Sequence, residues 1–277
     1  MKGHRRSSGS SSRVRFLGAH NGGAHRDWYR AIAEHYDAIA NSVWRDRTVD
    51  YLDRLFRRHR VVRAVDVACG TFAIDLPLAK RGFEIAGRDL SPSMVRVARR
   101  SLREAGVRAD VAVGDMRTLR LKRTFDAVVC LGTAFNYLVD PGDVQQAFRS
   151  FRGLLRPGGL LVLDLTNFDA FLDGPMNARA DIDYRAPNGT RVAIFGFNEQ
   201  NPSKTVHLAR FLTVIQRGRA IDIAFDAAPL KVWRKEGIAR ALSRAGFRPM
   251  EWRGDLRIGA PYRRGTSPRL VSVAVLR

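Results

Sequence analysis

Three aspartates, Asp66, Asp89 and Asp115, each follow a short apolar run that is typical of a buried strand. Asp66 leads into a turn of small residues, where Ala68 and Gly70 let the backbone approach a ligand closely. Asp89 comes about twenty residues after that turn, at the spacing where a carboxylate binds the ribose hydroxyls of a nucleoside cofactor. Because the carboxyl ends of parallel strands share one sheet edge, the three carboxylates predict a nucleoside site there.

The adenine end of such a site has its own candidates. Asp115 can accept a hydrogen bond from an exocyclic adenine amine, while the Met116 backbone reaches the ring edge. Ser91 and Pro92 begin a helix as its N-cap and first residue. Met94 lies on the first turn of that helix, where its thioether packs either on adenine or in the core.

The elements that must position these residues alternate along the chain. The expected strands are 61–66, 83–86, 107–113, 125–131 and 160–165, and the expected helices are 73–81, 92–106 and 143–155. This alternation indicates right-handed βαβ units. We therefore predict an α/β fold: a Rossmann-like, doubly wound, mostly parallel seven-stranded sheet, closed by a helix at 232–245 and strands at 247–252 and 270–276.

The periodicity changes to two between residues 173 and 230. Alternating runs at 190–197, 205–216 and 220–225 are typical of antiparallel strands, with hairpin turns at 188–189 and 217–218. The sequence therefore predicts an antiparallel β-layer inserted into the α/β fold.

Five segments follow from these patterns. The predicted segments are a disordered basic tail at 1–25, an N-terminal helical lid at 26–60, a cofactor-binding core at 61–172, the β insertion over the active site at 173–230, and a closing helix and strands at 231–277. The tail has too few apolar residues to offset the entropy of ordering. Helical patterns at 26–40 and 46–58 fit either a cover for the sheet or a lid over a ligand, and both interpretations stay open.

The composition limits the classes of molecule that we expect the protein to bind. The 277-residue chain carries a net charge of +21, which raises nucleic acid as a partner. However, only six of its 48 basic residues are lysine, and the arginines are scattered without interleaved aromatic residues. We therefore expect no nucleic-acid partner.

Location and metal content are also predicted from composition. No apolar run reaches the roughly 18 residues needed to cross a bilayer, and no hydrophobic segment follows the basic N-terminus. We expect a cytoplasmic protein with no membrane partner. The two cysteines, Cys69 and Cys130, offer neither a disulfide framework nor metal-ligand spacing, so we expect no metal.

From residue 26 to the end, the chain resembles the class I S-adenosylmethionine (SAM) methyltransferases. The resemblance rests on the motifs at 66–71, 89–94, 114–116 and 156–159. Within this class, residues 130–135, residues 164–171 and the late β insertion are similar to the glycine N-methyltransferases and to the amino-sugar N-methyltransferases of antibiotic pathways.

The resemblance implies SAM as cofactor and assigns residues to it. The implied cofactor residues are Arg47, Asp66, Ala68, Gly70, Asp89, Leu90, Met94, Asp115, Met116, Cys130 and Leu131. Arg47 falls where glycine N-methyltransferases place the arginine that pairs with the methionine carboxylate of SAM; the alternative is a solvated helix residue.

The acceptor side is implied less directly. The expected catalytic residues are Tyr137, Asn136 and Tyr36, and the expected substrate-binding residues are Thr133, Thr166 and Asn167. Tyr137 would orient the nucleophile or accept its proton; alternatively, it is an aromatic residue packed at the edge of the sheet.

Four departures from the family pattern stand out. Phe72 replaces a second glycine in the cofactor turn, so its side chain either points away, with φ below zero, or reshapes the pocket. Thr166 replaces the arginine that grips the carboxylate of glycine, which disfavours glycine as acceptor. Tyr137 stands where the amino-sugar enzymes have a histidine, and Ala40 replaces an active-site tyrosine.

We therefore expect a small-molecule methyltransferase that methylates an amine of a specialised metabolite by in-line SN2 transfer. The alternatives are C- or O-methylation of an aromatic or indole-like natural product, an inactive SAM-binding protein, and an RNA methyltransferase. No Pro-Cys pair follows the fourth strand and no Asn/Asp-Pro-Pro-aromatic motif occurs, which disfavours nucleic-acid substrates. The resemblance also suggests a homo-oligomer, a dimer or a tetramer.

Overall fold

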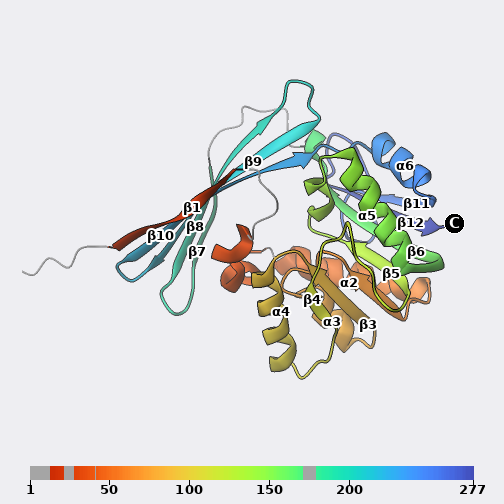
Figure 1. The fold of residues 1–277 in the computed structure, drawn as a ribbon, viewed down its shortest axis with the longest axis horizontal. Helices are drawn as coiled ribbons and strands as arrows, with labels where there is room; N and C mark the ends of the chain where they lie inside the picture. Colours follow the sequence, from red (N-terminus) through yellow and green to blue (C-terminus); the bar gives the residue numbers. More distant parts are fainter. Residues whose placement is uncertain (1–12, 22–27, 41, 171–178) are drawn as a thin grey trace, which may run out of the picture.

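The computed structural model describes residues 13–21, 28–40, 42–170 and 179–277, arranged as two β-sheets with helices around the larger one (Figure 1). Residues 1–12 and 22–25 of the predicted tail, and residues 173–178 of the predicted insertion, lie outside the described residues. Within the described ranges, no helix is both long enough and apolar enough to cross a bilayer.

The larger sheet has seven strands. They are β2 (Arg63–Asp66), β3 (Glu84–Asp89), β4 (Val111–Val113), β5 (Phe125–Cys130), β6 (Leu155–Thr166), β11 (Phe247–Arg253) and β12 (Arg269–Leu276), in the order β11-β12-β6-β5-β2-β3-β4. All pairings are parallel except those of β12 with β11 and β6. This topology confirms the predicted fold class.

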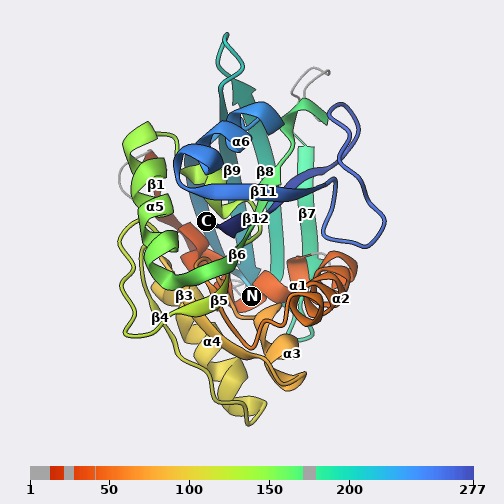
Figure 2. The same cartoon turned by 90° about the vertical axis from the view of Figure 1, so that its right-hand side faces the viewer.

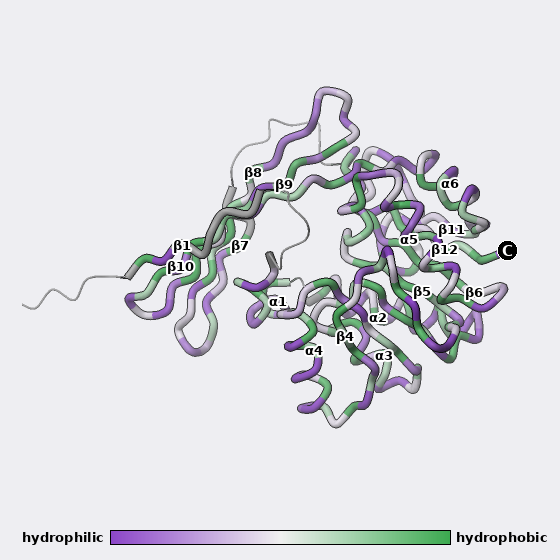
Figure 3. The backbone as a smooth tube through the Cα atoms, viewed as in Figure 1, coloured by the Kyte–Doolittle hydropathy of each residue, from purple (hydrophilic) through white to green (hydrophobic). Residues whose placement is uncertain are grey.

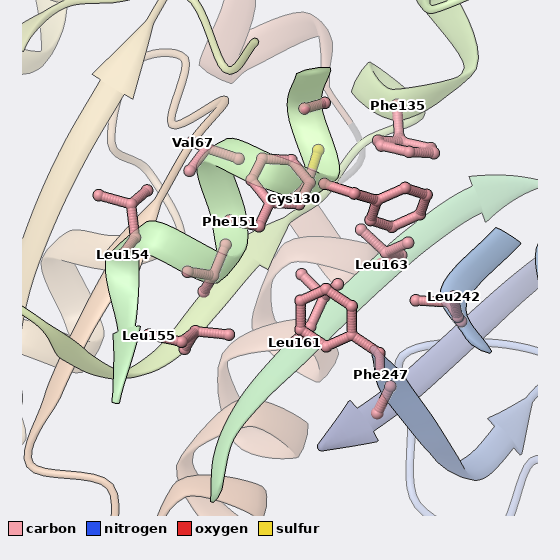
Figure 4. Packing of buried hydrophobic residues seen from close by; sticks show 14 of the residues in the cluster. Val67, Cys130, Phe135, Phe151, Leu154, Leu155, Leu161, Leu163, Leu242 and Phe247 are labelled. Atoms are coloured by element: carbon pink, nitrogen blue, oxygen red, sulfur yellow. The ribbon is translucent and has the colours of Figure 1, made fainter. Parts of the chain in front are cut away.

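Helices cover both faces of this sheet. They are α2 (Ser42–Arg58), α3 (Asp75–Lys80), α4 (Pro92–Glu104), α5 (Pro141–Leu154) and α6 (Lys235–Arg244). Phe151 of α5 and Leu242 of α6 pack with Leu161 and Phe247 on one face (Figure 4). Leu52 of α2 belongs to the second core, on the other face. Figure 2 shows α6 lying beside β11 and β12.

Helix boundaries follow local chemistry. Ser91 is the N-cap of α4, and its hydroxyl accepts a hydrogen bond from Met94 N at 3.1 Å. Pro92 follows at the first helical position, as the sequence predicts. Strand β3 therefore gives way sharply to helix α4, whose first turn lies close to the carboxyl end of the strand.

The smaller sheet contains the predicted insertion and extends away from the core (Figure 1). Its strands are β1 (Arg13–Asn21), β7 (Arg179–Arg185), β8 (Arg191–Gln200), β9 (Val206–Arg217) and β10 (Ala220–Lys231), in the order β1-β10-β9-β8-β7. Figure 3 shows polar and apolar residues alternating along these strands, the pattern from which most of them were predicted.

The prediction of disorder is wrong for residues 13–21. They form β1, which pairs in parallel with β10. The edge of β10 offers unpaired backbone groups, and a strand added there satisfies them at little cost in apolar burial. Arg15 adds an ion pair with Asp222 at 2.8 Å.

Other boundaries also differ from the prediction. The segment read as one helix at 26–40 is two 3₁₀ turns, η1 (Trp28–Ala31) and η2 (Ala33–His35), followed by α1 (Tyr36–Ile39). We call residues 28–40 the lid segment. Strand β10 extends to Lys231 rather than 225, because pairing with β9 continues through a stretch that lacks β-branched residues. This extension brings residues 226–229 to the functional site.

Candidate functional site

A cavity of about 450 Å³ opens at the carboxyl edge of the parallel strands. It is lined by the ends of β2, β3 and β5, the loop after β4, the lid segment and α2, and by parts of β9 and β10. Ligands of doubly wound sheets bind at this edge, and the volume lies in the range of small-molecule and cofactor sites. Both sheets thus contribute to one cavity.

The first two aspartates shape the glycine turn. Asp66 accepts a hydrogen bond from Ala68 N at 2.8 Å. The Asp89 carboxylate accepts one from Gly70 N and one from Ser91 N, each at 2.8 Å. A carboxylate has about four acceptor positions, so Asp89 can hold the turn and still bind a ribose. Gly70 has a φ of +53°, a conformation that favours glycine.

Asp115 is tied to a neighbouring arginine. Arg117 Nη2 lies 2.6 Å from Asp115, and Nη1 of the same side chain lies 2.9 Å from Asp143. The two carboxylates therefore neutralise Arg117 within the cavity wall. Met94 and Met116 line the same region, with Met94 almost fully buried.

Two buried carboxyl groups lie beneath the glycine turn. Burial, together with nearby Asp89, raises the pKa of Asp66 to about 7, although the Ala68 N–H opposes the shift. Burial raises the pKa of Asp75 well above its usual range, and Asp66 adds to the effect. Both Asp75 oxygens lack a hydrogen-bond partner among the described residues. Burial leaves the charged form of each carboxyl group poorly solvated, so the protonated form is favoured.

Phe72 does not enter the cavity. Its side chain is fully buried in the core beside Cys69. Its φ is +66°, so the expectation of a φ below zero is wrong, although the side chain does point away. Space for it comes from β3: a Cβ on Gly87 would lie 2.9 Å from Phe72 Cε2 and 2.8 Å from Cys69 Sγ. Phe72 thus stands where the family pattern has a glycine, and Gly87 of the neighbouring strand leaves the space that its ring occupies.

Tyrosines from two elements meet across the cavity. The rings of Tyr29 and Tyr36 pack edge to face, with centroids 5.6 Å apart. Tyr137, from the 3₁₀ turn η3 (Ala134–Tyr137), is hydrogen-bonded to Tyr29. Burial raises the pKa of Tyr29 and of Tyr36 above their usual range, with Tyr137 and Asp89 contributing respectively. All three side chains line the cavity, and Tyr29 and Tyr36 do so as neutral phenols.

The lid segment is fastened to the cofactor turn. Asp37 accepts a hydrogen bond from the Thr71 hydroxyl. Arg45 Nη1 donates to the Asp37 carbonyl at 3.4 Å and lines the cavity. The lid segment, the start of α2 and the glycine turn are therefore one connected wall.

The structure brings most of the predicted site residues together. The predicted residues that line the cavity are Tyr36, Asp66, Ala68, Gly70, Asp89, Leu90, Met94, Asp115, Met116, Leu131 and Tyr137. Their roles toward a ligand stay predictions.

Three predicted residues lie elsewhere. Arg47 is exposed on α2, two positions from Arg45, which lies at the cavity instead. Cys130 is fully buried, and burial raises the pKa of its thiol well above the usual range, which keeps it unreactive. Asn136 is also fully buried: its amide donates to the Lys231 carbonyl at 2.9 Å and accepts from Thr166 N at 3.2 Å. None of the three side chains lines the cavity, and their contacts with a ligand stay predictions.

The predicted substrate residues lie in a closed polar network. The hydroxyls of Thr133 and Thr166 lie 2.7 Å apart, and each accepts a hydrogen bond from Arg269 at 3.0 Å. The other donors of Arg269 bind Asp164, with contacts of 2.7 and 2.8 Å to its carboxylate. An arginine has five N–H donors, and here all five are used. None of these four side chains lines the cavity, and the acceptor contacts of the two threonines stay predictions.

The side chain of Asn167 also makes its hydrogen bonds within the protein. It is almost fully buried, and its amide donates to the carbonyls of Arg264 and Ser267 at 2.7 Å each. It fastens the loop before β12 to the end of β6 and does not line the cavity. Acceptor binding by Asn167 stays a prediction that these contacts do not support.

Sequence reasoning missed several cavity residues: Tyr29, Trp44, Arg45, Phe211 and Asp226. A carboxylate within the alternating run of β10 was a usable signal for Asp226. The position of Arg45 depends on the rotational phase of α2, which the sequence did not define.

Comparison with known proteins places this site in context. Residues 64–159 match the family model described as a methyltransferase domain. Over 127 residues, the chain is 33% identical to a glycine/sarcosine N-methyltransferase of Parasynechococcus marenigrum, with 45% of each chain covered. The chain spans about half the length of the first curated relatives it matches.

Two solved structures extend the comparison. A SAM-dependent methyltransferase of Clostridium acetobutylicum has a TM-score of 0.75 at 18% identity, covering 90% of this chain and 98% of that one; it shows the fold. A SAM-bound amino pentose methyltransferase of Micromonospora echinaspora, involved in calicheamicin biosynthesis, has a TM-score of 0.67 at 25% identity, covering 93% and 100%.

Proposed function

We propose that residues 64–159, which match a methyltransferase-domain model, bind SAM and that the protein methylates an amine of a small molecule. We further propose that the acceptor is a specialised metabolite, since similar chains include sugar and glycopeptide N-methyltransferases. The observation that carries the proposal is that one cavity is lined both by the three strand-end aspartates and by Tyr137.

The cavity residues fit SAM. In this proposal the Asp89 carboxylate binds the ribose hydroxyls, and the loop of Asp115 and Met116 faces adenine. Arg45, which lines the cavity, replaces Arg47 as the partner of the methionine carboxylate. When bound, SAM supplies an electrophilic methyl group on a sulfonium, open to in-line SN2 displacement.

The chain's own residues then have to orient the acceptor, because in-line transfer depends mostly on positioning. Tyr137 is held by its hydrogen bond to Tyr29, and it lines the cavity together with Tyr36. We assign it the role of orienting the acceptor nitrogen. The lid segment, fastened through Asp37 and Thr71, excludes water from this region.

The test has two stages. Titration calorimetry with SAM measures cofactor binding, and mass spectrometry of reactions with an acceptor panel detects a gain of one methyl group. Absence of SAM binding refutes the proposal. Tight binding without turnover over a broad panel favours an inactive SAM-binding protein, and RNA binding with a steep salt dependence favours an RNA methyltransferase.

C- or O-methylation of an aromatic acceptor is the second candidate, and the aromatic side chains of Tyr29, Trp44 and Phe211 in the cavity wall favour it. Products from matched arylamine and phenol acceptors separate the two candidates. Methylation of the phenol but not of the amine supports the second.

A further inference from the structure

The cavity has the opposite charge to the protein. The chain carries a net charge of +21, yet seven aspartates line the cavity: Asp37, Asp66, Asp89, Asp115, Asp140, Asp143 and Asp226. Two arginines also line it, and one of them, Arg117, is neutralised by Asp115 and Asp143. A cleft lined by one sign of charge focuses the field and concentrates ligands of the opposite sign. The raised pKa of Asp66 leaves that carboxyl partly neutral near pH 7, but the other aspartates still outnumber the two arginines, so the cavity attracts cations.

One of these carboxylates comes from the smaller sheet. Asp226 of β10 is 5% exposed and lies directly opposite Phe211 of β9 in the antiparallel ladder. Residues that face each other in such a ladder project from the same side of the sheet, with Cβ atoms about 5 Å apart. Both side chains line the cavity. A carboxylate and an aromatic ring are thus adjacent in the wall formed by the insertion.

Aromatic groups surround the same space. Phe211 packs in one cluster with Tyr29 and Tyr36, and in a second cluster with Tyr137. The faces of aromatic rings attract cations, more strongly where water is excluded. A carboxylate next to such rings is the chemistry that recognises an ammonium group.

We propose that Asp226 and Phe211 form a subsite for an ammonium group of the methyl acceptor. The inference rests on the proposed function and specifies its substrate class: a cationic amine whose body is apolar or aromatic. To expose the nitrogen lone pair, the bound ammonium gives one proton to the Asp226 carboxylate, which becomes a neutral acid.

The same wall disfavours zwitterionic acceptors such as amino acids. The arginine nearest to Thr166 is Arg269, and all five of its donors are used by Asp164, Thr133 and Thr166. No N–H of that guanidinium is left to grip a carboxylate. An acceptor carboxylate would instead meet the negative charge of Asp226.

The test uses matched fragments in the presence of S-adenosylhomocysteine. Ligand-observed NMR measures binding of 2-phenylethylamine, 2-phenylethanol and 3-phenylpropionate to the wild-type protein, and we expect the ammonium to bind at least tenfold more tightly than the other two. In Asp226→Asn we expect about a tenfold loss for the ammonium alone. In Phe211→Leu, which keeps the charge, we expect about a threefold loss.

Asp222→Asn is the matched control. Asp222 lies on the same strand but outside the cavity, where it pairs with Arg15 and Arg217. Its replacement should leave all three affinities unchanged. Equal binding of the three fragments to the wild type, or full ammonium binding in a folded Asp226→Asn, overturns the inference.

Calorimetry with SAM on the same samples separates the two proposals. If the wild type binds SAM but shows no preference for the ammonium, only the subsite is refuted. If it binds no SAM, the proposed function fails as well.

Discussion

The two halves of the cavity are built differently. On the cofactor side, Asp66 and Asp89 are fixed by backbone N–H groups within a few residues of the strand ends. On the acceptor side, Tyr29, Tyr137 and Asp226 come from three distant segments and meet only through tertiary packing. Local sequence therefore encodes where the cofactor would bind, whereas the acceptor half depends on how the lid segment and the insertion fold over it.

The largest expected effect is on the cofactor side. Asp89→Ala removes the acceptor for Gly70 N and Ser91 N and the proposed ribose ligand, so SAM affinity should fall about 1,000-fold, or about 4 kcal/mol. Titration calorimetry measures the loss. Asp50→Ala, at an exposed ion pair with Arg81, is the control and should bind SAM normally. A loss below about tenfold in Asp89→Ala would show that the turn does not depend on this carboxylate.

The next effect separates the two halves. Tyr137→Phe removes one hydroxyl from the acceptor side, so turnover should fall about 100-fold while SAM affinity changes little. Steady-state rates and calorimetry on the same sample give both quantities. Unchanged turnover, or a parallel loss of SAM affinity, would contradict the assigned role of Tyr137.

A third change concerns the packing under the turn. Gly87→Ala places a Cβ within 3 Å of Phe72 and Cys69, so the free energy of unfolding should fall by about 2 kcal/mol. Gly153→Ala, on α5 with no atom within 4 Å of its added Cβ, should be neutral or stabilising. Denaturant unfolding compares the two.

A double variant tests the pairing of Gly87 with Phe72. In a Phe72→Leu background the cost of Gly87→Ala should shrink, because the ring atom that clashes is gone. Additive effects of the two substitutions would mean that the residues do not share this space.

The smallest effect is on pH dependence. Asp66 has a folded-state pKa of about 7, above the ordinary aspartate value, so the folded protein binds more protons than the unfolded chain between these values. Stability should therefore decrease as pH rises from about 4 to about 7 through Asp66, and Asp75, whose pKa is also raised, adds to the decrease. Asp75→Asn removes the second buried carboxyl group with a raised pKa, so we expect it to flatten this decrease by about 1 kcal/mol. Denaturant unfolding of both proteins at pH 5 and pH 8 measures the difference; an equal slope would contradict it.

The fold and the cofactor half were predictable because their signals are local. The strand ends at Asp66 and Asp89 and the N-cap Ser91 are each defined by a few adjacent residues. The same argument gave the antiparallel hairpins of the insertion, whose turns and alternation are also short-range.

The features that sequence reasoning missed depend on contacts between residues that are distant in the chain. Thr166 was read as a substrate residue because its partner Arg269, 103 positions away, is invisible locally. Asn136 was predicted to contact the ligand, but its side-chain amide donates a hydrogen bond to the Lys231 carbonyl of β10. Strand β1 was missed because its stability comes from the open edge of β10 and not from its own pattern.

The hydrogen bond between Asp37 and Thr71 connects the acceptor side of the cavity to the cofactor side. The lid segment that carries Asp37 also carries Tyr29 and Tyr36, so any movement that frees the glycine turn also withdraws two walls of the acceptor side. The acceptor side is therefore complete only after the lid segment has settled on the turn. We therefore expect an order of binding in which the proposed cofactor enters before the acceptor and leaves after the methylated product.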